Sequence, residues 1–186
     1  MTDEPHTHHE YDEEIGALEA ALAEMGRLAG QQLDDGLRAL RERDAELGHT
    51  VCTSDYRINE LEVRIDRLAT AMIARRQPTG SDLRFVIAAI RTGTDLERVG
   101  DEAGKLGRFA IEFAGSRALE SRLLQGMQRL GEDVQAVFRR ALEARAAREA
   151  EAAAETARAA EHVARVQGAL LREFVTYMLE DPRTIQ

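Results

Sequence analysis

The sequence contains few of the residues that form disulfides, aromatic cores or chain breaks. Among its 186 residues there are one cysteine, three prolines and no tryptophan, and 4% of the residues are aromatic. A single cysteine excludes an intrachain disulfide framework and fits a reducing compartment. The shortage of proline and aromatic residues, with Ala, Leu, Glu and Arg abundant, favours long helices over sheets. The expected fold class is therefore all-α.

Long apolar runs and an excess of basic residues are also missing. No apolar run approaches the roughly 20 residues that a membrane span requires, and no signal-peptide core follows Met1. We therefore expect a cytoplasmic protein without membrane insertion. The chain carries 34 Asp and Glu against 25 Lys and Arg, a formal net charge of -9. Such a chain lacks the basic face that nucleic-acid binding requires, so no nucleic-acid partner is expected.

Apolar residues recur at spacings of three and four along the first part of the chain and predict three helices. These helices are expected over residues 11–43, 44–76 and 81–113. Short connections would join them into one antiparallel three-helix bundle, which we assign to residues 11–115. Residues 1–10 are polar and are expected to form a disordered tail.

Local signals mark the ends of these helices. Asp44 and Ser81 have the short polar side chains that cap helix N-termini, so they are predicted to cap the second and third helices. Pro78 disfavours helical geometry at the residue before it and should end the second helix near Arg76.

The helical pattern weakens over residues 116–186. Two further helices are expected, but the run from Arg145 to Glu161 is almost entirely Ala, Glu and Arg. Such a run has high helix propensity and little capacity to form a core. A second three-helix bundle would need one helix more. The sequence therefore predicts an incomplete second bundle and about five long helices in all.

Two acidic pairs at helical spacing are the most informative local feature. Glu62 and Asp66 form one Glu-x-x-x-Asp pair, and Glu97 and Asp101 form another. Each pair lies on one helix face, where like charges cost the helix a few tenths of a kcal/mol. The pairs can face each other if their helices are antiparallel, and Asp55 could extend the acidic row. Carboxylate oxygens suit Mg, Mn, Fe or Zn, so the pattern predicts a metal site.

Three other interpretations remain open from the residues alone. First, the acids could be surface residues paired with nearby arginines, namely Arg57, Arg64, Arg67 and Arg98. Second, the chain could be a carboxylate-bundle metal store or metal-dependent enzyme, but only Glu46-Leu-Gly-His49 fits the Glu-x-x-His motif of such sites. No phosphate loop, nucleophile elbow or His-Glu-x-x-His occurs, so we identify no catalytic residue and expect no enzyme. Third, the chain could be a structural module whose unfinished bundle associates with another copy.

Three segments resemble the PhoU family. They are Ile58-Asn-Glu-Leu-Glu-Val-Arg-Ile-Asp66, Ile73-Ala-Arg-Arg-Gln-Pro-Thr-Gly-Ser-Asp-Leu-Arg84 and Asp95-Leu-Glu-Arg-Val-Gly-Asp-Glu-Ala-Gly-Lys105. The Arg-Gln-Pro and Leu-Glu-Arg-Val-Gly-Asp segments at this separation are specific. The similarity covers residues 11–112 and resumes at residues 171–185.

The resemblance implies a fold, a role and partners. The family has two tandem three-helix bundles, each with a metal motif, and its members are cytoplasmic and often oligomeric, so a homodimer is expected. They act as negative regulators of phosphate transport and phosphate signalling. The implied partners are the ATPase subunit of the phosphate ABC transporter and a sensor histidine kinase, which would bring the protein to the inner face of the membrane. The family's metal residues map onto Glu62, Asp66, Glu97 and Asp101.

The second repeat departs from the family pattern. Ala160, Ala164 and Gly168 stand where family members carry acids. The sixth helix that the family would place after Gln186 is absent. A second metal site is therefore not expected. A naturally shortened gene product and a fragment of a longer one both remain open.

Overall fold

The computed structural model describes residues 4–114 and 121–180, together with the side chains of residues 11–114 and 125–180. All regular structure in these residues is helical, so the predicted all-α fold with five long helices is confirmed. The chain divides into two compact units, Met1–Glu112 and Phe113–Gln186.

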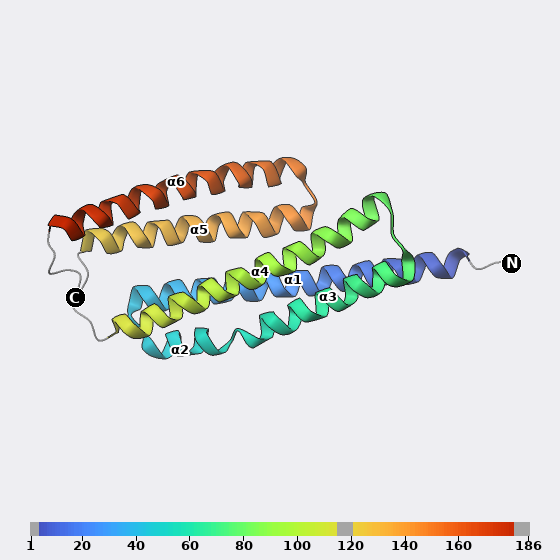
Figure 1. Ribbon diagram of the computed structural model, residues 1–186, viewed down its shortest axis with the longest axis horizontal. Helices are drawn as coiled ribbons and strands as arrows, with labels where there is room; N and C mark the ends of the chain where they lie inside the picture. Colours follow the sequence, from blue (N-terminus) through green and yellow to red (C-terminus); the bar gives the residue numbers. More distant parts are fainter. Residues whose placement is uncertain (1–3, 115–120, 181–186) are drawn as a thin grey trace. The chain divides into compact units, whose positions relative to one another are not determined.

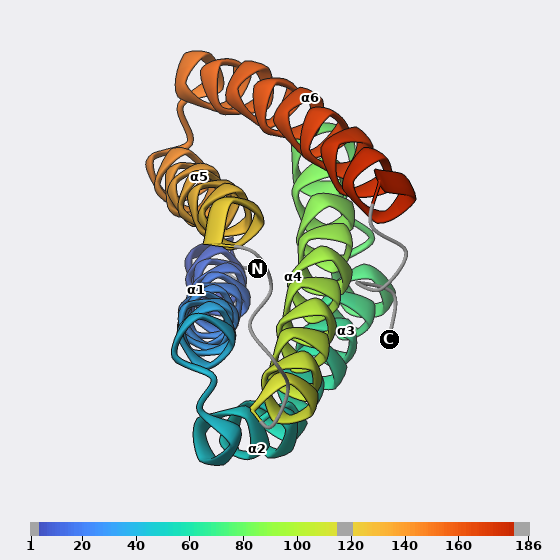
Figure 2. The same ribbon diagram turned by 90° about the vertical axis from the view of Figure 1, so that its left-hand side faces the viewer.

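The first unit contains four helices. These are α1 (Glu4–Glu42), α2 (Ala45–Thr53), α3 (Tyr56–Arg76) and α4 (Gly80–Phe113). Within this unit α1, α3 and α4 run side by side in alternating directions, and α2 lies at the end where the chain passes from α1 to α3 (Figures 1 and 2).

The predicted apolar stripes form the core of this unit. Large apolar side chains of α1, α3 and α4 point inward at intervals of one or two turns. Seven of them are at most 1% exposed: Leu18, Leu22, Met25, Ile58, Ile65, Met72 and Val86. Burial of a side chain of this size stabilises a fold by about 1.5–3 kcal/mol. These residues therefore fix α3 and α4 against α1.

The start of α1 differs from the expectation. Residues 4–10 were predicted as part of a disordered tail, but α1 begins at Glu4, so the prediction is wrong for these residues. Pro5 lies in the first turn of α1. A backbone N–H there would have no acceptor within the helix, so proline, which lacks this N–H, is tolerated. Residues 1–3 lie outside the described part of the chain.

Two of the predicted helix ends are confirmed and one is not. Leu47 donates its backbone N–H to the Asp44 carboxylate over 3.0 Å, so Asp44 caps α2 as predicted. Helix α3 ends at Arg76, also as predicted. Ser81 is not a cap, because α4 already begins at Gly80.

The single helix predicted over residues 44–76 is in fact two helices, α2 and α3. Gln32 of α1 donates its side-chain N–H to the Val51 carbonyl over 3.0 Å, and the Ser54 hydroxyl donates to the same oxygen over 3.0 Å. In an unbroken helix that carbonyl would accept from the N–H of Asp55. Side-chain donors that capture helix carbonyls bend or break helices. The break places Asp55 at the beginning of α3.

The second unit is a pair of helices, α5 (Ser121–Ala147) and α6 (Ala150–Glu180). Among its described side chains and backbone positions, only Gly131, Ala144 and Thr156 are buried. A core this small is what the alanine-rich sequence predicts. The described residues of this unit form two helices, as the sequence predicted.

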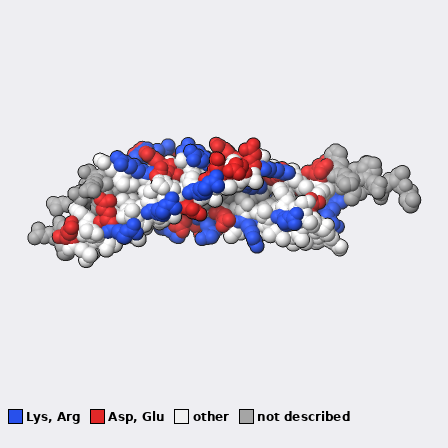
Figure 3. Space-filling model, turned by 90° about the horizontal axis from the view of Figure 1, so that it is seen from above, with Lys and Arg blue, Asp and Glu red and all other residues white. Residues whose placement is uncertain are grey.

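The surface carries charges of both signs. On the face shown in Figure 3, acidic and basic side chains are interspersed, and neither forms a continuous region. Among the described helices, none has both the length and the apolar character needed to cross a membrane.

Candidate metal centre

Four of the five predicted ligands lie close together in the first unit. The pKa of Glu97 is raised, first by burial and then by the carboxylates of Asp101, Glu62 and Asp55, while Arg98 acts in the opposite direction. Glu97 and Asp101 come from α4, and Glu62 and Asp55 come from α3 and its start. Packing of these two elements therefore gathers four carboxylates, which we call the acidic cluster.

The fifth predicted ligand, Asp66, stands apart from this cluster. It lies one turn after Glu62 on α3 and is exposed. Among the described residues, no group of three or more His, Cys, Asp or Glu side chains is arranged to hold a metal ion. The carboxylates by themselves thus do not form a coordination shell in this structure.

The arginines near these acids form their ion pairs elsewhere in the described residues. Arg98 forms its ion pair with Asp95, with 3.7 Å between Nη1 and Oδ1. Within residues 11–114, no ion pair reaches any of the five predicted ligands, Asp55, Glu62, Asp66, Glu97 and Asp101. Among the described residues, the arginines therefore act on the acidic cluster at longer range, Arg98 on Glu97 and Arg108 on Asp55, and not through ion pairs.

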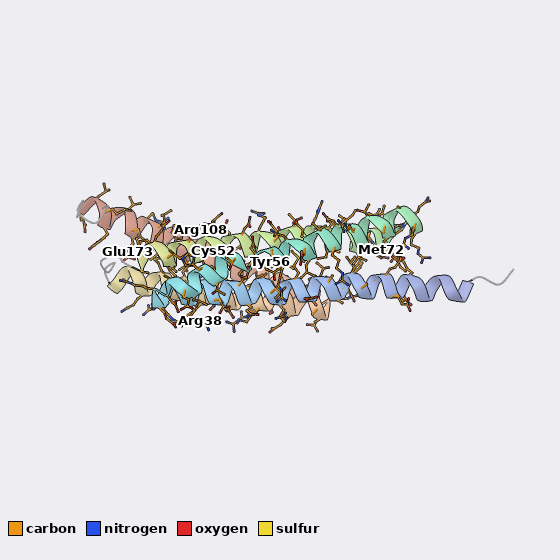
Figure 4. All side chains as sticks on the ribbon, turned by 90° about the horizontal axis from the view of Figure 1, so that it is seen from below. Arg38, Cys52, Tyr56, Met72, Arg108 and Glu173 are labelled. Atoms are coloured by element: carbon orange, nitrogen blue, oxygen red, sulfur yellow. The ribbon has the colours of Figure 1, made fainter. Side chains whose placement is uncertain are left out.

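Asp55 is the most constrained member of the acidic cluster. Burial raises its pKa most, and the charge of the neighbouring Asp101 raises it further, while Gln32 and Arg108 act in the opposite direction. Its Oδ1 atom is buried without a hydrogen-bond partner. Arg108 of α4 lies near the start of α3, which Tyr56 marks in Figure 4. The structure thus holds a carboxylate where it is partly desolvated and faces a second negative charge.

Gly100 brings the α4 backbone close to two buried oxygens. A Cβ atom at this position would lie 3.1 Å from Oδ1 of Asp55 and 3.3 Å from Oε1 of Gln32. Both oxygens are buried and lack a donor. Buried oxygens without donors are costly unless a water, a proton or a cation serves them. Carboxylate and amide oxygens are the ligand types that hard cations such as Mg²⁺ or Mn²⁺ prefer.

The other reactive side chains have local roles in packing or lie on the surface. The thiol of Cys52 donates to the Gly104 carbonyl over 3.4 Å where α2 meets α4, and the residue is partly buried. Glu46 and His49, which form the Glu-x-x-His motif, are exposed on α2.

Comparison with known proteins identifies sequence relatives of this chain. The PhoU domain family matches residues 22–110. The chain is 35% identical over 180 residues to the phosphate-specific transport system accessory protein PhoU of Edwardsiella tarda, an alignment that covers 97% of this chain and 73% of that protein. It is 37% identical over 182 residues to the PhoU homolog of Pseudomonas aeruginosa, with 96% of this chain and 75% of that protein covered.

Solved structures show the same similarity. The crystal structure of PhoU from Pseudomonas aeruginosa matches with a TM-score of 0.89 at 37% identity, covering 94% of this chain and 83% of that one. The phosphate transport system regulatory protein PhoU from Streptococcus pneumoniae matches with a TM-score of 0.77 at 26% identity, covering 92% of this chain and 80% of that one.

Proposed function

Since this chain belongs to the PhoU family, we propose that it regulates phosphate uptake and phosphate-responsive two-component signalling. It acts as a metal-binding adaptor and negative regulator between the ATPase subunit of a phosphate ABC transporter and a sensor histidine kinase, without catalysing a reaction. This role places it in the cytoplasm at the inner face of the membrane. The observation that carries the proposal is the match over nearly the whole chain to an accessory protein of phosphate-specific transport.

The acidic cluster is the proposed metal site. Asp55, Glu62, Glu97 and Asp101 would hold the cation, and Asp66 would extend the site outward along α3. A divalent or trivalent ion such as Mg, Mn, Fe or Zn would neutralise carboxylates that form no ion pair within the described residues 11–114. By binding residues of both α3 and α4, it would join two helices that otherwise repel each other there.

The turn that joins α3 to α4 is a proposed contact surface for the partners. Glu14 of α1 holds it, because its carboxylate pairs with Arg75 at 3.2 Å and with Arg76 at 3.3 Å. The Arg75 side chain nevertheless remains 64% exposed. A fixed turn therefore presents a positively charged group to solvent, which suits recognition of an acidic surface on a partner.

Capture of the two proposed partners tests this function. The immobilised full chain should retain both the transporter ATPase subunit and the cytoplasmic part of the sensor kinase. Arg75→Glu should weaken retention, because it reverses the charge on the turn, whereas Arg41→Glu at the far end of α1 should not. If the folded wild-type protein retains neither partner, the adaptor function is wrong.

A second proposed property is self-association through α6. Leu171, Val175 and Leu179 are 62%, 46% and 77% exposed, and their spacing of four places them in one row along the helix. Rows of exposed large apolar side chains commonly mark contact surfaces between proteins. A second copy of the chain presents the same row, so we propose a homodimer in which the two α6 rows pack together.

The solution mass of the chain tests this dimer. Light scattering of the wild-type protein at micromolar concentration should give the mass of a dimer. Leu171→Glu combined with Leu179→Glu should give a monomer, because the charges cannot be buried in an apolar contact. Ala160→Glu, also on an exposed position of α6, serves as the control and should remain dimeric. A monomeric wild-type protein would contradict the proposal.

A further inference from the structure

Gln32 is a polar residue buried in the core of the first unit. Its side chain is 5% exposed, although it lies on a helix whose inward face is otherwise apolar. Its Nε2 group donates to the Val51 carbonyl over 3.0 Å. This bond fixes the plane of the amide, so that Oε1 faces away from Val51. Oε1 is buried and has no hydrogen-bond partner.

The free oxygen of Gln32 faces the acidic cluster. Both Oε1 of Gln32 and Oδ1 of Asp55 approach the same point over Gly100, at 3.3 Å and 3.1 Å from the position of an added Cβ. Both atoms accept hydrogen bonds, and neither receives one. Two acceptors without donors at one place can be served by a water, by a shared proton or by a cation bound to both.

We propose that Gln32 is a metal ligand, with Oε1 completing the cation site that the acidic cluster begins. This inference rests on the metal-binding role proposed above. It adds a neutral amide oxygen beside the carboxylate of Asp55. A neutral amide oxygen beside carboxylates suits hard cations such as Mg²⁺ and Mn²⁺ better than cations that prefer sulfur or nitrogen ligands. Because Gln32 lies on α1, this ligand would also connect the cation to α1. The same side chain donates to the Val51 carbonyl at the break between α2 and α3.

Two substitutions at this position separate a ligand from a packing residue. Gln32→Met fills similar space but removes both the Nε2 donor and the Oε1 ligand. Gln32→Glu also removes the donor to Val51 but keeps an oxygen ligand. Gln31→Met is the matched control, because Gln31 is the adjacent glutamine on the exposed face of α1. Circular dichroism of each full-length variant checks that the helices form.

Metal affinity and bound water are measured on the full chain. Mn²⁺ affinity comes from titration of the metal-free protein, and the luminescence lifetime of bound Tb³⁺ in H₂O and D₂O counts the waters on the ion. Gln32→Met should weaken Mn²⁺ binding about tenfold or more and admit about one additional water to Tb³⁺. Gln32→Glu should retain both Mn²⁺ binding and the wild-type water count. Gln31→Met should match the wild type.

The outcomes distinguish this inference from the function on which it rests. If the wild type itself binds neither ion, the proposed metal-binding role fails. If the wild type binds and Gln32→Met binds equally well with the same water count, Gln32 is not a ligand and the carboxylates alone hold the cation. If Gln32→Met and Gln32→Glu lose affinity equally, the hydrogen bond to Val51 accounts for the effect and the ligand assignment is overturned.

Discussion

Replacing Asp101 with asparagine is expected to stabilise the metal-free protein and to weaken its binding of Mn²⁺ at least tenfold. Both effects come from the loss of one negative charge, which repels its neighbours in the metal-free protein and binds the cation in the metal-bound protein. The carboxylate of Asp101 raises the pKa of both Asp55 and Glu97, so at neutral pH it opposes two neighbouring charges. Removing it relieves a repulsion of a few tenths of a kcal/mol and removes a ligand. Urea unfolding in chelator, beside a Mn²⁺ titration, measures both effects.

The pH dependence follows from the raised pKa values of Asp55 and Glu97. A carboxyl whose pKa is higher in the folded state than in the unfolded state holds its proton more tightly when folded. The contribution of these two groups to the stability of the metal-free protein should therefore grow as pH falls from neutral through the raised values toward the ordinary 3.8 and 4.5. The advantage of Asp101→Asn should shrink over the same range.

Asp95→Asn is the matched control for Asp101→Asn. Asp95 lies on the same helix, is exposed, and pairs with Arg98 instead of joining the acidic cluster. Its substitution should leave Mn²⁺ binding unchanged and should not stabilise the metal-free protein. A destabilised Asp101→Asn protein in chelator would show that the cluster carries no unrelieved repulsion.

Gly107→Ala is expected to destabilise the first unit by about 2–3 kcal/mol. A Cβ at this position would lie 2.8 Å from the backbone oxygen of Gly48 and 3.1 Å from the sulfur of Cys52. The reverse also holds, since a Cβ at Gly48 would lie 2.7 Å from the backbone oxygen of Gly107. Backbone atoms cannot move aside as a flexible side chain can, so α2 and α4 must separate. Urea unfolding of the metal-free protein measures the loss.

Gly104→Ala provides the control on the same helix. An added Cβ there would meet only the end of the Arg108 side chain, at 3.9 Å. This variant should gain about 0.5–1 kcal/mol, because alanine is the better helix former. If Gly107→Ala is as stable as Gly104→Ala, the close approach of α2 to α4 is not what the structure describes. The close contact of α2 with α4 matters for the acidic cluster because it helps to fix α2. The break between α2 and α3 follows directly and determines the position of Asp55.

The sequence predicted the core of the first unit well because its information is local. Apolar residues at spacings of three and four define the inward faces of α1, α3 and α4, and the large residues on those stripes are buried. The break after Ser54 was not predictable in this way, because it depends on Gln32, 19 residues away on another helix. The turn between α5 and α6 lacks the usual glycine and uses Arg148 with a φ of 55°. The first feature depends on a distant residue, whereas the second is a local helix end held by the bonds from Arg148 N–H to Arg145 and from Glu149 N–H to Ala144.

The candidate site was predictable in part for the same reason. The Glu-x-x-x-Asp spacing identified Glu62, Glu97 and Asp101, and the antiparallel packing of their helices was inferred from the short connection. Gln32, which we propose as a further ligand, was not predicted because a glutamine in an acidic, helical sequence gives no motif. The available signal was its position, since residue 32 falls three residues after Ala29 and four before Gly36 on the buried face of α1. A polar side chain on such a face needs a partner within the protein.

The most direct test of the account is a Mn²⁺ titration of the metal-free full chain beside Glu97→Ala and Asp101→Ala. The account predicts one saturable site in the wild-type protein and at least a tenfold loss of affinity in each variant, with the helices intact by circular dichroism. No saturable binding by the wild type, or equal binding by all three proteins, would show that the acidic cluster is not a metal site.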